Sequence, residues 1–116
     1  MSYVEGFLMA VPNANKQAMR ESAAKFAAIL KDYGASRVVD CWGDDVPEGS
    51  ITDFRRAVKA EAQETVVFAW AEWPSKKMRD EANAKLRGDA RLQPSEMPFD
   101  GKRMIFGGFE VLHDSN

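Results

Sequence analysis

The ten residues ETVVFAWAEW, Glu64 to Trp73, decide the fold. They contain no glycine or proline and are rich in β-branched and aromatic side chains, which indicates a β-strand. Apolar residues occupy both faces of this strand: Val66, Phe68 and Trp70 on one, and Val67, Ala69, Ala71 and Trp73 on the other. A strand that is apolar on both faces is buried on both. Helices in so small a protein can cover only one face, so we expect a second copy of the chain to cover the other.

The composition is that of one ordinary globular domain, spanning residues 1–116. The chain is 45% apolar and 29% charged, with a formal net charge of −2. We expect no nucleic-acid partner, because such proteins usually carry a basic face. The single cysteine, Cys41, cannot form an internal disulfide, which favours a reducing cytoplasm. We see neither a signal peptide at the N-terminus nor an apolar run long enough for a membrane helix.

The remaining sequence predicts three further strands and two helices. Strands are expected at Tyr3–Val11, Ala35–Trp42 and Arg103–Leu112, and helices from Asn13 or Asn15 to Tyr33 and from Lys76 to Arg87. Asn13 or Asn15 can cap the first helix, Gly34 can end it, and Ser75 can cap the second. The order β-α-β-β-α-β predicts an α+β, ferredoxin-like domain with a four-stranded antiparallel sheet and both helices on one face. Residues 52–59 fit either a short helix capped by Thr52 or an irregular edge segment.

The first and last strands repeat the two-sided apolar pattern of Glu64–Trp73. In Tyr3–Val11, Phe7, Met9 and Val11 alternate with Val4, Leu8 and Ala10. A monomer would expose the second sheet face as an apolar patch larger than soluble monomers usually carry. We therefore predict that two sheets pack face to face in a homodimer, as a dimeric α/β barrel.

Three long segments resemble the YbaA-like family of small bacterial proteins of unknown function. They are VVDCWGDDVPEG (38–49), TDFRRAVKAEAQETVVFAWAEWPSK (52–76) and MPFDGKRMIFGGFE (97–110). The resemblance implies membership of the dimeric α/β-barrel superfamily, hence a ferredoxin-like homodimer. Relatives in that superfamily include cofactor-free monooxygenases, haem-degrading enzymes and muconolactone-type isomerases, and carry a pocket between sheet and helices. The resemblance does not imply one particular reaction.

Four aromatic side chains are candidates for contact with a small apolar or aromatic ligand in such a pocket: Trp42, Phe68, Trp70 and Trp73. Small-molecule sites are mostly apolar, with a few placed polar groups. The alternative is that these large side chains fill the core and the dimer interface, as most aromatics do.

Asp40 is the candidate catalytic residue, because a carboxylate in the middle of an apolar strand has a raised pKa unless it is paired. It could then act as a general base. The alternative is a structural ion pair with one of the arginines at positions 37, 55, 56 and 103. We expect Cys41 to be a buried, inert thiol and His113 to lie in a solvated tail. No metal site or cofactor is predicted.

Two functions follow from these observations. The first is a small-molecule pocket between sheet and helices, used by an enzyme of the monooxygenase or isomerase type that needs no cofactor. The second is a non-catalytic dimeric binding or stress-associated module. RNA binding ranks below both, because the IFGGF run at 105–109 falls on the fourth strand of an acidic chain.

Overall fold

The computed structural model describes residues 2–92 and 97–116. The elements in chain order are β1 (Tyr3–Pro12), α1 (Lys16–Asp32), β2 (Arg37–Trp42), α2 (Phe54–Ala57), β3 (Glu64–Trp73), α3 (Lys76–Leu86) and β4 (Ile105–Glu110). Short 3-10 turns precede α1 at Asn13–Asn15 and β4 at Gly101–Arg103. Between the second helix and the last strand, the sequence from Asp89 to Pro98 is polar and contains two prolines, which predicts a linker; part of it, residues 93–96, lies outside the described residues.

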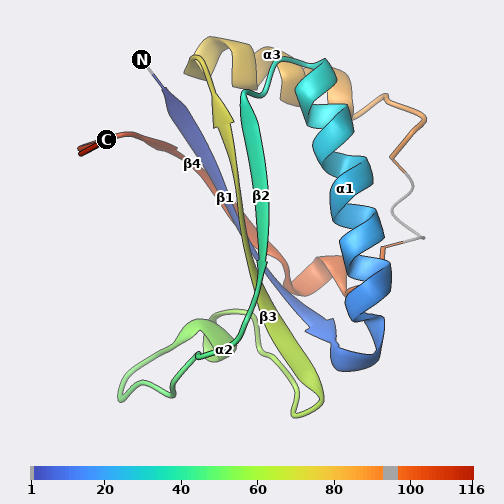
Figure 1. Cartoon of the computed structure of the whole chain (residues 1–116), viewed down its shortest axis with the longest axis vertical. Helices are drawn as coiled ribbons and strands as arrows, with labels where there is room; N and C mark the ends of the chain where they lie inside the picture. Colours follow the sequence, from blue (N-terminus) through green and yellow to red (C-terminus); the bar gives the residue numbers. More distant parts are fainter. Residues whose placement is uncertain (1, 93–96) are drawn as a thin grey trace.

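The four strands form one antiparallel sheet in the order β2-β3-β1-β4. The two central strands pair over their whole length, from Tyr3 opposite Trp73 to Pro12 opposite Glu64. Figure 1 shows α1 and α3 on the same side of this sheet. This arrangement confirms the predicted α+β, ferredoxin-like fold. None of the helices in the described ranges is long and apolar enough to cross a membrane.

Helix α1 begins without the predicted side-chain cap. Asn15 occupies the N-cap position but makes no capping hydrogen bond; its Nδ2 instead donates to the carbonyl of Pro98 at 2.9 Å. Asn13 is also engaged elsewhere, because its Oδ1 accepts from the hydroxyl of Thr65. Both asparagine side chains are therefore hydrogen-bonded to residues distant in sequence instead of capping the helix. The other end follows the prediction: Gly34, with φ of 111°, comes just after the helix, where the left-handed region favours glycine.

The two remaining helices are capped by side chains. Ser75 Oγ accepts from the amide of Met78 at 3.2 Å, which confirms the predicted N-cap of α3. The undecided segment 52–59 contains the short helix α2, and its cap is Asp53 rather than Thr52. Asp53 Oδ1 accepts from the amide of Arg56 at 2.7 Å, which lowers the pKa of the Asp53 carboxyl.

The core lies between the sheet and the two long helices. Its most completely buried side chains include Val11, Leu30, Val67 and Trp73. Trp73 Nε1 donates to Glu5 Oε1 at 3.0 Å, so the indole satisfies its polar atom inside the core. The large apolar side chains of β1 and β3 on this face therefore pack as the strand alternation predicts.

The opposite sheet face, called the open face below, is the one that α1 and α3 do not cover (Figure 1). Large apolar side chains remain accessible there: Phe68 is 45% exposed, Ile105 44% and Phe109 60%. The loop that carries α2 extends on this side, and the ring of Phe54 meets that of Phe68 edge to face at 6.0 Å. Burial of apolar area stabilises proteins, so this face is suited to contact with another apolar surface.

Candidate functional site

A cavity of about 350 Å³ lies between α1 and the sheet. Its apolar walls include Phe7 and Met9 of β1, Met19 and Phe26 of α1, and Phe99 and Met104 from the segment before β4. The space exists because α1 presents small residues between its two large ones. Ser22 and Ala23 face the cavity there, and short side chains do not reach the sheet.

Asp40 lies in the wall of this cavity and is its only charged lining residue among those described. Asp40 comes from the edge strand β2 and is exposed to solvent. Partial burial nevertheless raises the pKa of the Asp40 carboxyl above its usual value. An apolar hollow with one carboxylate at its exposed edge can hold a small molecule and accept a hydrogen bond, or a proton, from it.

The structural ion pair considered for Asp40 is not formed with any of the four arginines, because each is engaged elsewhere. Arg37 reaches Glu72 at 3.9 Å, and Arg103 pairs with Glu64 at 2.7 Å. Arg55 donates to backbone carbonyls, and Arg56 pairs with Glu48 and Asp53. The Asp40 carboxylate therefore lacks a cationic partner within the described part of the chain.

A second hollow of about 320 Å³ lies next to the cavity, between the first half of α1 and β2, and is called the outer groove below. Asp40 and Met19 line both spaces, so the carboxylate stands at their junction. Lys16, Arg20 and Trp42 line the groove but not the cavity. Lys16 Nζ lies 5.4 Å from the centroid of the Trp42 ring, which is a cation–π distance.

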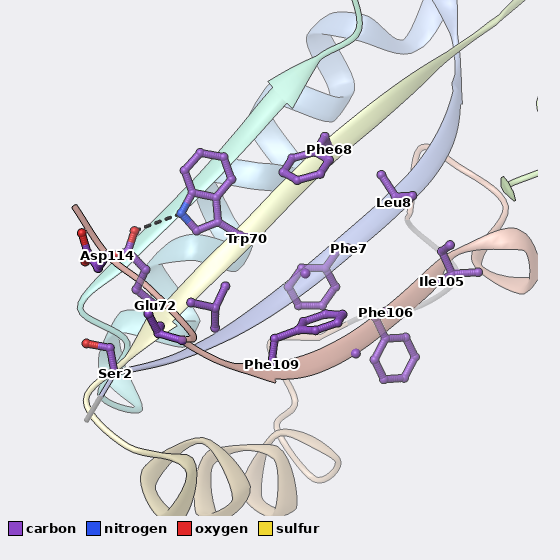
Figure 2. Close-up of a pocket in the computed structure, with 14 residues that line it drawn as sticks. Ser2, Phe7, Leu8, Phe68, Trp70, Glu72, Ile105, Phe106, Phe109 and Asp114 are labelled. Atoms are coloured by element: carbon purple, nitrogen blue, oxygen red, sulfur yellow. Dashed lines mark hydrogen bonds between the residues drawn. The ribbon is translucent and has the colours of Figure 1, made fainter. Parts of the chain in front are cut away.

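The rings of Phe68 and Trp70 lie on the open face, on the other side of the sheet from the cavity, although Trp70 also lines the cavity. Figure 2 shows both rings on β3, with Leu8 on the adjacent strand β1 and with Ile105 and Phe109 beyond it on β4. The rings of Phe68 and Trp70 meet at 6.0 Å, and Trp70 Nε1 donates to Glu72 Oε2 at 2.9 Å. They line a shallow hollow of about 670 Å³ on this face.

Trp73 has no exposed surface and belongs to the core. Its indole is part of a buried polar cluster: Glu5 also accepts from Arg79 Nε at 2.9 Å and from Asn83 Nδ2 at 3.1 Å. The structure thus distributes the five predicted site residues over three places. Asp40 and Trp42 lie beside α1, Phe68 and Trp70 on the open face, and Trp73 in the core.

Several cavity residues were missed from the sequence. Met19 and Phe26 recur at helical spacing in the sequence of α1 as part of an apolar stripe, a pattern that predicts packing rather than a site. Phe99 lies just beyond a segment interpreted as a linker, and Met104 at the edge of a strand; neither carries a signal for a cavity wall. Cys41 is exposed, so the prediction of a buried thiol was wrong; the residue lies on an edge strand, with α1 on the other face.

The fold and its two faces define the class of protein: a ferredoxin-like α+β domain with one helix-covered and one open sheet face. The chain belongs to the family described as "Protein of unknown function (DUF1428)", whose model matches residues 2–101. It is 57% identical to the uncharacterized protein YbaA of Escherichia coli strain K12, over 98% of this chain and 99% of that protein. YbaA of Shigella flexneri matches equally well. These matches confirm the resemblance drawn from the sequence.

Among solved structures, the chain resembles a dimeric ferredoxin-like protein from an uncultured marine organism. The TM-score is 0.64, with 8% sequence identity, and the match covers 97% of each chain. At this identity the likeness shows the fold alone, and it agrees with the ferredoxin-like topology seen here.

Proposed function

We propose that this protein is a homodimer that binds a small molecule in the cavity between α1 and the sheet. The observation that carries the proposal is the cavity itself: about 350 Å³, walled by aromatic rings and thioethers, with one carboxylate at its edge. Binding sites for small molecules have this volume and this mixture of apolar walls with a few polar groups.

The homodimer is supported by the open face. Phe68, Ile105 and Phe109 expose large apolar side chains over one shallow hollow on β1, β3 and β4. Isolated exposed apolar residues are ordinary, but a contiguous patch usually marks an interface. A second open face has the same shape and chemistry, and the marine structural neighbour is itself described as dimeric.

Filling the cavity tests the binding function. Ala23→Met places a long side chain in the cavity wall, whereas Ala28→Met places it on the exposed side of the same helix. We expect the first variant to weaken binding of a neutral probe, 1-naphthalenemethanol, by tenfold or more in calorimetric titration, and the second to leave it unchanged. Equal affinity in both variants would overturn the proposal.

A second candidate function is an enzyme that transfers a proton without a cofactor, and the raised pKa of Asp40 favours it. A general base works best when its pKa approaches the working pH. Asp40→Asn would then abolish turnover of a bound substrate without changing the subunit mass. Unchanged turnover would remove Asp40 from the mechanism and leave a non-catalytic binding module.

A further inference from the structure

The chemistry at Asp40 narrows the class of ligand, given the proposed binding function. The carboxylate stands where the cavity meets the outer groove. The cations that line the groove with it come from α1. Lys16 lies over the Trp42 ring, and Arg20 Nη1 donates to Gln17 Oε1 at 3.4 Å. Directly opposite Asp40 on β3 is Ala69, which is uncharged. Within the described residues, no hydrogen bond or ion pair joins Asp40 to another side chain, so its exposed carboxylate is available to a cationic ligand.

The cavity walls favour a flat, polarizable body. Phe7, Phe26 and Phe99 contribute rings, and the rings of Phe7 and Phe26 meet edge to face at 6.4 Å. Met9 and Met19 add thioethers, which make favourable contacts with aromatic rings and adapt to irregular shapes. Aromatic faces also attract cations. The volume of about 350 Å³ limits the ligand to a small ring system.

We propose that the cavity binds a small aromatic amine, with its rings among the phenylalanine and methionine side chains and its ammonium group on Asp40. The ammonium group supplies both the positive charge and the hydrogen-bond donors that Asp40 lacks in the free protein. A neutral alcohol of the same size supplies a donor without the charge. A carboxylate supplies neither, and its charge opposes that of Asp40.

Three probes that share one ring system test this assignment: 1-naphthylmethylamine, 1-naphthalenemethanol and 1-naphthaleneacetate. Each is titrated calorimetrically into the wild-type protein, into Asp40→Asn, and into Asp44→Asn, which removes the same charge from an exposed loop. We expect the wild type to bind the amine at least tenfold more tightly than the alcohol, and the acetate most weakly. Charge-assisted hydrogen bonds are stronger than neutral ones, which sets this order.

In Asp40→Asn the amine should bind no more tightly than the alcohol, and the affinity for the alcohol should be unchanged. Asp44→Asn should bind all three probes as the wild type does. Equal affinity for amine and alcohol in the wild type, or an amine preference that survives in Asp40→Asn, would overturn the ligand class and leave the binding function standing. Binding of none of the three probes would overturn the proposed cavity function, and this inference with it.

Discussion

The ion pair between Glu64 and Arg103 should make the stability of the protein, and of the cavity wall, depend on acidic pH. Arg103 Nη1 and Nη2 lie 2.7 and 2.8 Å from the two oxygens of Glu64, whose side chain is 4% exposed. The pair ties the 3-10 turn Gly101–Arg103 to the start of β3. Gly101, at the start of this turn, and Met104, just after it, line the cavity. The same interaction thus supports the fold and the candidate site.

The expected change in the free energy of unfolding with pH follows from the pKa of Glu64. Hydrogen bonding to the Arg103 guanidinium lowers that pKa from 4.5 to about 2. The native state therefore favours the ionised carboxylate more than the unfolded chain does. Its contribution to the free energy of unfolding is fully present well above pH 4.5 and is lost as the pH falls towards 2. At 1.36 kcal/mol for each pKa unit, this contribution is at most about 3 kcal/mol, of which about 2 is lost by pH 3.

The perturbation is Glu64→Gln, compared with the wild type and with Glu61→Gln, whose side chain is exposed. Urea unfolding at pH 7 and pH 3 gives the free energy of unfolding of each protein. We expect Glu64→Gln to be less stable than the wild type at pH 7 by up to about 3 kcal/mol, and the difference to shrink by about 2 kcal/mol at pH 3. The control should follow the wild type at both values. A difference that is the same at pH 7 and pH 3 would refute the reasoning.

Three further predictions concern the open face and the core. Phe109→Glu places a charge on the open face, so native mass spectra should change from two chains in the wild type to one; a dimer in both would show that the interface lies elsewhere. Glu5→Ala removes the acceptor of Trp73 Nε1 and of Arg79 Nε, leaving Asp80 as the ion-pair partner of Arg79, and should lower the free energy of unfolding by about 3–5 kcal/mol. Glu5→Gln should cost clearly less, and equal costs would argue against a charge effect. Phe26→Ala should cost less than the roughly 3–5 kcal/mol of a fully buried phenylalanine, because this ring is half-buried beside an existing cavity; a larger loss in urea unfolding would contradict that view of the site.

Much of the fold could be predicted because its signals are local. The strand β3 begins at Glu64 and ends at Trp73, where the two-sided apolar run begins and ends. Gly34 and Ser75 mark a helix end and a helix start through their own backbone and side-chain chemistry. These features depend on a few neighbouring residues, so a pattern in the chain is sufficient to locate them.

The candidate site could be predicted less well, because it depends on contacts between distant segments. Asn15 was expected to cap a helix, yet it donates to Pro98, 83 positions away. The cavity exists because α1 carries the short side chains of Ser22 and Ala23 where it faces the sheet, while Phe99 closes another side. No local sequence pattern indicates that these distant segments meet around a space. The separation of Trp70 from Trp73, by contrast, follows from their odd spacing in a strand, which places them on opposite faces.

The cavity and the proposed dimer interface share the strand β3, so a change on one side of the sheet can affect the other. Ala69 of β3 lines the cavity, while the rings of its neighbours Phe68 and Trp70 line the hollow on the open face. A ligand and a partner subunit would therefore press on opposite faces of the same backbone. If either shifts β3, the coupling is reciprocal: the factor by which dimerisation raises ligand affinity equals the factor by which the ligand strengthens the dimer. A monomeric Phe109→Glu variant that binds 1-naphthalenemethanol with wild-type affinity would mean that this factor is one, and that the two faces of the sheet act independently.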